Sequence, residues 1–173
     1  METVTQNVDT AVAIKKAQAA DLLTILSNAS RQKKMPLKFC LAQNIKKLQE
    51  PVTAYLDDKE ALFKAAVVLD DEGNGVVKEE YKEQAAQMGG RVPYGMFEYS
   101  SEEAMKEFNE KLKELNNEEI KVDFVKERAD RVIKVSDQEG NYVNSTIQEV
   151  LEDPNNEVTP AMITLFIEYF LEV

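Results

Sequence analysis

The chain has 173 residues, of which 43% are hydrophobic and 31% are charged, with only six Gly and five Pro. This length is enough to bury a core, and the balance indicates a folded, helix-rich protein rather than a disordered chain, a sandwich or a barrel. The sequence contains no His, which excludes the usual general base, His-dependent nucleophiles and the commonest zinc ligand.

The single cysteine, Cys40, excludes an internal disulfide and a thiolate cluster, and its apolar helical surroundings predict a small core residue. We therefore predict a protein that is not an enzyme and that uses no cofactor and no metal. The first ten residues have neither the basic nor the apolar region of a signal peptide, and no apolar run is long enough to span a bilayer. We expect a cytoplasmic protein without a membrane partner.

The net charge of -11 is unevenly distributed. Residues 1–50 carry eight Lys and Arg against four Asp and Glu, whereas residues 135–173 carry eight carboxylates and no Lys or Arg. This acidity makes nucleic-acid binding unfavourable, because counterion release requires clustered cations. The short basic stretch "RQKKMPLK" indicates a solvated connection between helices, with a contact to a phosphate or an acidic partner as the alternative.

In chain order, residues 10–30 predict a first helix whose densest apolar face is around Leu22 and Leu26. The following segment has apolar residues at alternating spacings of four and three, which predicts a long helix with a heptad seam typical of coiled coils. Pro36 suits the start of this helix, whereas Pro51 predicts either a kink or a junction between two helices. The seam consists of Leu41, Ile45, Leu48, Val52, Tyr55, Lys59, Leu62, Ala66 and Leu69.

The stretch "LDDEGNGVVKEEY" at residues 69–81 half matches the calcium loop of an EF-hand. Asp70, Glu72 and Asn74 take ligand positions 1, 3 and 5, but position 12 is Tyr81 instead of the bidentate Glu. The same turn-forming residues return in "DQEGN" at 137–141, so both stretches predict tight turns. A weak cation site is the alternative for the first.

Residues 76–88 predict a short helix or an irregular return, and residues 88–99 predict a loop rich in Gly. The loop aromatics beside Arg91 either form a contact surface for a base, peptide or partner, or pack on the core, which we favour. Ser100 and Glu103 predict a capping box that opens a helix to about residue 116. The aromatics are Tyr94, Phe97 and Tyr99, and the buried stripe of the helix is Met105, Phe108, Leu112 and Leu115.

Alternation in "EIKVDFVKE" predicts a half-buried strand, and "RVIKVS" predicts a second. If "NYVNS" pairs back across the Asp137 turn, the chain has a small antiparallel sheet of two or three strands. The final stretch "TPAMITLFIEYFLEV" predicts a helix that Thr159 caps and that runs from Pro160 to the C-terminus. This helix is apolar on most sides, including Phe166 and Phe170, so it must be covered either in the core or at a subunit interface.

Together these elements predict a mainly α protein of the α+β class, with a long helix or helical hairpin, a small antiparallel sheet and a buried C-terminal helix. We predict a single domain over residues 1–173. Residues 10–87 form its helical part with a turn at 70–75, residues 88–99 a loop, and residues 100–173 the next helix, the sheet and the final helix.

The stretch "MPLKFCLAQNIKKL", followed by a long helix and an acidic Asp-x-Glu-Gly-Asn turn, resembles small proteins encoded by tailed bacteriophages and bacterial prophages. The later "NNEEIKVDF" and the apolar terminal helix are similar too, and the likeness covers about a quarter of the chain. The resemblance implies a phage genome as the context and assigns no catalytic residues. Pro51 departs from the family pattern, which continues as an uninterrupted helix.

Three functions follow as hypotheses. The first is a non-enzymatic helical interaction or assembly protein of phage or prophage type, which binds itself or another phage or host protein in the bacterial cytoplasm, with virion association open. The second is an acidic inhibitor or nucleic-acid mimic that occupies a basic cleft of a host protein. The third is a metal-dependent enzyme that uses only carboxylates. The candidate interaction residues are Arg91, Tyr94, Phe97, Tyr99, Phe166 and Phe170.

Overall fold

The structure, a computed structural model, describes residues 11–31, 37–136, 141–153 and 160–172. It confirms a mainly α fold with small two-stranded sheets. The chain divides into two compact units, which we call unit 1 (Met1–Val52 and Glu119–Val173) and unit 2 (Thr53–Glu118). The sequence predicted one domain in three consecutive parts, whereas unit 1 is built from both ends of the chain. Helix α2 (Lys38–Ala66) contributes to both units.

Unit 1 begins with a strand that the sequence analysis missed. Strand β1 (Val12–Lys15) pairs antiparallel with β2 (Glu119–Val122) and places Ile14 opposite Ile120. Its alternating burial, with Ile14 buried and its two neighbours exposed, is typical of a half-buried strand. The predicted helix from residue 10 is therefore wrong at its start, and helix α1 spans Lys16–Ser30.

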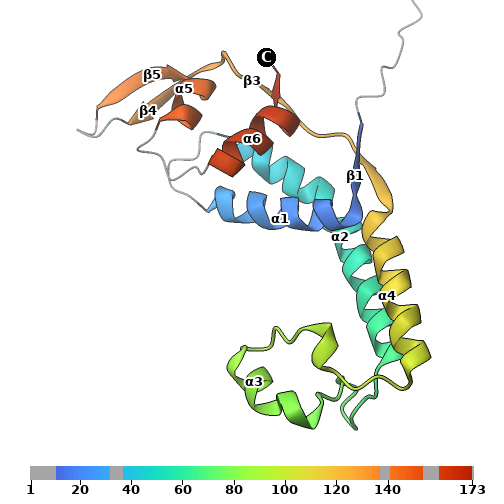
Figure 1. Cartoon of the computed structure of the whole chain (residues 1–173). Helices are drawn as coiled ribbons and strands as arrows, with labels where there is room; N and C mark the ends of the chain where they lie inside the picture. Colours follow the sequence, from blue (N-terminus) through green and yellow to red (C-terminus); the bar gives the residue numbers. More distant parts are fainter. Residues whose placement is uncertain (1–10, 32–36, 137–140, 154–159, 173) are drawn as a thin grey trace, which may run out of the picture. The chain divides into compact units, whose positions relative to one another are not determined.

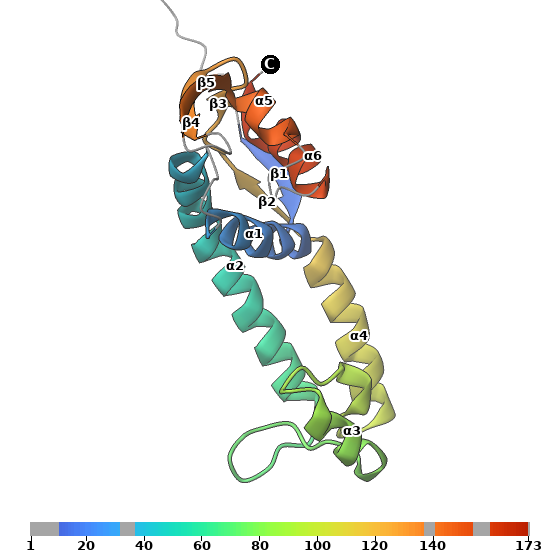
Figure 2. The same ribbon diagram turned by 90° about the vertical axis from the view of Figure 1, so that its left-hand side faces the viewer.

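Helix α1 and the first part of α2 supply much of the core of unit 1, with α6 (Pro160–Tyr169) beside them (Figures 1 and 2). One helix runs through Pro51, so of the two predicted alternatives the junction between two helices is wrong. Most of the heptad seam is buried, but Leu69 is exposed because α2 ends at Ala66. Pro36 and most of the basic stretch lie outside the described residues. The fully buried aliphatic residues of this core include Leu26, Leu41 and Leu48.

The predicted hairpin is confirmed by strands β4 (Val132–Ser136) and β5 (Tyr142–Thr146), which pair antiparallel. Its turn at 137–140 lies outside the described residues. Helix α5 (Ile147–Glu152) follows directly and was not predicted. It has a capping box: the Thr146 hydroxyl accepts the Glu149 N–H at 3.2 Å, and the Glu149 carboxylate accepts the Thr146 N–H at 2.8 Å.

The end of unit 1 differs from the predicted helix, because α6 stops at Tyr169. Strand β6 (Leu171–Glu172) pairs parallel with β3 (Glu127–Arg128), and the Glu127 N–H donates to the Phe170 carbonyl at 2.8 Å. The Thr159 cap lies outside the described residues. Phe166 and Phe170 are fully buried within the chain, and Phe170 packs edge-on against Phe124 at 5.4 Å, so both are core residues.

Unit 2 is built on an antiparallel pair of helices, the last part of α2 and helix α4 (Glu102–Asn117), which run side by side (Figures 1 and 2). The Tyr55 hydroxyl donates to the Asn116 side chain at 2.7 Å and joins the two helices. The cap of α4 is Ser101, which accepts the Ala104 N–H at 3.0 Å, whereas Ser100 donates to the Ala66 carbonyl. The predicted capping box of Ser100 and Glu103 is therefore wrong, and Ser101 caps the helix instead.

The connection between these helices folds back on their ends. Backbone hydrogen bonds join residues 67–69, 75–77 and 96–99, and the remaining chain forms a 3-10 turn (Glu79–Tyr81), α3 (Lys82–Gln87) and another 3-10 turn (Tyr94–Met96). Gly75 suits this position, because a Cβ atom would lie 2.8 Å from the Phe63 ring and 2.9 Å from the Phe97 ring, so that a ring would have to shift. Of the predicted stretch at 76–88, only Lys82–Gln87 is α-helical, and the preceding residues return along the chain through bridges and a 3-10 turn.

The stretch at Asp70 forms the predicted turn. The Asp70 carboxylate accepts the backbone N–H of Asn74 at 2.8 Å and of Glu72 at 3.0 Å, which lowers the pKa of this carboxyl. Gly73 takes the left-handed conformation, with φ of +80°, at the tip. The carboxylate is thus engaged in closing the turn, and the absence of a physiological calcium site stays a prediction.

Candidate functional site

Polar side chains near the start of α2, spaced about one helical turn apart, form hydrogen bonds with the backbone of the segment that follows β2. The Asn44 amide donates to the Val125 carbonyl at 2.8 Å and accepts the Val125 N–H at 2.8 Å, so it pairs with that peptide group as a neighbouring strand would. One turn earlier, the Cys40 thiol donates to the same carbonyl at 3.1 Å. One turn later, Lys47 donates to the Asp123 carbonyl. This ladder fixes where the chain leaves β2.

Asn44 is fully buried and is the residue that the sequence analysis most clearly missed. A polar residue between Leu41 and Leu48 in an apolar seam was the available signal, because a buried amide requires hydrogen-bond partners. Its partner, Val125, lies 81 positions away, so the sequence alone could not identify the contact.

Asn44→Ala should lower the free energy of unfolding by about 1 to 3 kcal/mol, because the partly buried Val125 N–H loses its acceptor. Chemical denaturation measures this change. Gln49→Ala, at an exposed position of the same helix, is the control and should change stability by less than about 0.5 kcal/mol. Equal effects of the two substitutions would contradict the structural role of Asn44.

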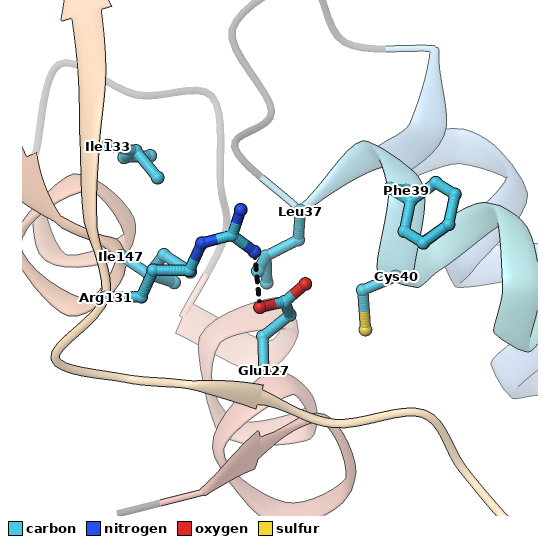
Figure 3. A pocket seen from close by; sticks show the side chains of 7 residues that line it. All are labelled: Leu37, Phe39, Cys40, Glu127, Arg131, Ile133 and Ile147. Atoms are coloured by element: carbon cyan, nitrogen blue, oxygen red, sulfur yellow. Dashed lines mark hydrogen bonds and ion pairs between the residues drawn. The ribbon is translucent and has the colours of Figure 1, made fainter.

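A pocket of about 180 Å³ lies beside Cys40 in unit 1. Figure 3 shows Leu37, which precedes α2, with Phe39 and Cys40 from its first turn on one side, Ile133 and Ile147 on the other, and an ion pair between Arg131 and Glu127 in the middle. The paired nitrogen and oxygen are 2.7 Å apart. Phe39 is 72% exposed at this pocket.

The chemistry of the pocket does not support a nucleophile. Burial, together with the charge of Glu127, raises the pKa of the Cys40 thiol from 9.0 to about 11, so the thiol stays protonated near neutral pH. The Glu127 carboxylate is held by Arg131 rather than aimed at the sulfur. Cys40 therefore has the environment of a structural residue, as the sequence predicted.

We expect iodoacetamide to label Cys40 only after denaturation at pH 8, with mass spectrometry as the readout. Because the native state keeps its thiol proton up to about pH 11 while the unfolded state loses it near 9, stability should fall as pH rises between these values. Cys40→Ser should remove this part of the pH dependence. Rapid labelling of the folded protein would contradict the inert thiol.

Unit 2 carries a larger hollow, which we call the α2–α4 groove. It is lined by Asp58, Ala61, Leu62, Ala65, Lys111, Glu114, Leu115 and Glu118 and has a volume of about 430 Å³. A smaller hollow of about 90 Å³ continues it along the same two helices and shares Leu62, Ala65 and Lys111. Its floor is apolar, and most of its rim residues are acidic.

Acidity is concentrated in this unit. Unit 2 carries sixteen Asp and Glu against eight Lys and Arg, whereas the longer unit 1 carries sixteen against thirteen. Within the groove and its continuation, Lys111 is the cation among the lining residues, and its amine lies 2.6 Å from the Glu107 carboxylate. A ligand in the groove therefore meets a negative rim.

The candidate residues from the sequence fall into three groups. Phe166 and Phe170 are in the core of unit 1. The loop aromatics pack on the helices of unit 2: the rings of Tyr94 and Phe97 lie 5.3 and 4.8 Å from Phe63, which the sequence analysis did not single out. Tyr99 packs against Phe108 at 5.9 Å. Arg91 is exposed, so the structure favours the core-packing interpretation of this loop.

The residues that the structure describes contain no group of three or more Cys, Asp or Glu arranged to hold a metal ion. None of the described helices has the length and apolar character to span a membrane. Comparisons with models of protein families, with curated proteins and with solved structures find no match for this chain.

Proposed function

We propose that this chain is a non-enzymatic interaction or assembly protein of phage or prophage type that acts in the cytoplasm of a bacterial host. The observation that carries the proposal is the α2–α4 groove, whose floor presents Ala61, Leu62, Ala65 and Leu115 in an open hollow. Open apolar hollows with a polar rim favour protein partners. The phage context rests on the resemblance around residues 35–48.

A second candidate is an acidic inhibitor of a host protein, and the acidic surplus of unit 2 favours it. Several of these carboxylates are paired with lysines one turn away, such as Glu60 with Lys64 and Glu107 with Lys111. The acidic residues that line the groove lie beside apolar residues such as Leu62 and Leu115, whereas the backbone of a nucleic acid presents its phosphates without such an apolar surface. These features make an assembly role the better supported of the two.

Site-specific photocrosslinking tests the proposal. A benzophenone amino acid at exposed position 65, in the groove, should give a discrete covalent adduct in cells that carry the parent genome. The same amino acid at exposed position 86 on α3 is the control and should give none. Mass spectrometry identifies the adduct.

A partner encoded in the same phage genome supports assembly, and a basic host protein supports the inhibitor instead. Equal adducts at both positions, or none at position 65, would contradict an interaction site in the groove.

A further inference from the structure

The lining of the α2–α4 groove follows helical spacing on both of its sides. On α4 the lining residues recur three and four positions apart from Ala104 to Glu118, so they share one face of that helix. On α2 they run from Asp58 to Ala66 with the same spacing. Two antiparallel helices that line one hollow in this way form the kind of groove in which a third helix packs in a helical bundle.

The size of the side chains agrees with a helical ligand. Ala61 and Ala65 are one turn apart, and both are exposed in the hollow. Their small side chains let a ligand backbone come within the 8 to 10 Å between axes that is typical of packed helices. The α4 side, from residue 104 to 118, is about 21 Å long, which corresponds to about four turns of a bound helix.

The charge of the groove rim indicates which charge a bound helix should carry. Asp58, Glu114 and Glu118 border the main hollow, and Glu107 borders its continuation, against the single cation Lys111. A second copy of this chain would bring more negative charge to the same place, because unit 2 has twice as many carboxylates as cations. Opposite charge on the ligand removes this repulsion.

We infer that the α2–α4 groove binds an amphipathic helix of another protein, with an apolar stripe against Leu62 and Leu115 and with Lys or Arg along both edges. The inference rests on the proposed function and names the chemistry of its partner. Burial of the apolar stripe against the groove supplies affinity, because apolar surface is removed from water. The Lys or Arg side chains lie next to the acidic rim, and this charge complementarity gives selectivity for a basic partner.

The test uses the full chain and three labelled synthetic peptides of about 21 residues, or six helical turns. The first peptide has Leu and Ala at the a and d positions of its own heptad repeat, and Lys at the positions on both sides of this apolar stripe. The second replaces Lys by Glu, and the third keeps Lys but replaces Leu by Ser. Fluorescence anisotropy measures binding at low and at physiological salt.

We expect saturable one-to-one binding of the first peptide, at least about tenfold tighter than of either of the others, and weaker in physiological salt. Ala65→Arg, which adds bulk and a positive charge in the groove, should weaken it by about tenfold or more. Ala86→Arg makes the same change at an exposed position on α3 and should have little effect. Circular dichroism confirms that both variants are folded.

Other outcomes overturn the inference. Equal weakening by Ala65→Arg and Ala86→Arg would mean diffuse attraction to an acidic surface, and equal binding of the Lys and Glu peptides would mean that the rim selects nothing. If no peptide binds while position 65 still crosslinks to a partner, the basic helix is wrong and the interaction function stands. If position 65 does not crosslink either, both fail.

Discussion

Phe166→Glu leaves unit 1 unfolded or molten, as measured by the loss of its cooperative thermal transition and of near-ultraviolet circular dichroism. Phe166 has no exposed surface, and its ring packs 5.9 Å from that of Phe170. A carboxylate at this place would be shielded from water, and loss of the phenyl ring would leave a cavity. Removal of the ring alone, in Phe166→Ala, costs about 3 to 5 kcal/mol, and the buried charge adds to this.

The adjacent residue is a matched control. Ile167 is on the same helix and is 45% exposed, so Ile167→Glu should leave the protein folded with a similar melting temperature. A folded Phe166→Glu protein with a smaller oligomeric state by light scattering would place this helix at a subunit interface instead of in the core.

Leu48→Ala should reduce the free energy of unfolding by about 2 to 5 kcal/mol, because a fully packed leucine leaves a cavity that the surroundings fill only partly. Leu48 has no exposed surface and belongs to the core cluster of unit 1. Chemical denaturation, monitored by far-ultraviolet circular dichroism, measures the change.

Leu56→Ala makes the same substitution two turns later on α2, where the side chain is 50% exposed. It should cost less than about 1 kcal/mol, since little apolar surface returns to water. If Leu48→Ala were as mild as Leu56→Ala, the heptad seam would not be packed at Leu48.

The elements that could be predicted are those with local signals. Helix α2, helix α4 and the β4–β5 hairpin depend on periodicity and on turn residues within each segment. Helix α5 also had a local signal, the Thr146–Glu149 capping box, which the analysis overlooked. At the start of α4 only Ser100, with Glu103 three residues later, matched the capping-box pattern, yet Ser101 caps the helix and the Ser100 hydroxyl donates to the Ala66 carbonyl, a contact that the local pattern does not show.

The elements that could not be predicted depend on partners far along the chain. Strand β1 pairs with β2 more than a hundred residues later, and its four residues "VAIK" fit a helix equally well in isolation. Strand β6 exists because Leu171 pairs with Glu127. The α2–α4 groove belongs to the same class, because its lining comes from two helices whose docking no local pattern specifies.

The composition of unit 1 from both ends of the chain has a consequence for synthesis on the ribosome. Unit 2 is one continuous stretch of the chain, so all of its residues are available for folding once residue 118 has left the exit tunnel. The first part of unit 1 must wait, because Val12 to Lys15 have no strand partner until β2 is made and the β3–β6 pair needs Leu171. During this interval the apolar side of α1 lacks the rest of the core that covers it in the folded chain. We expect chaperones that bind nascent chains to cover this surface.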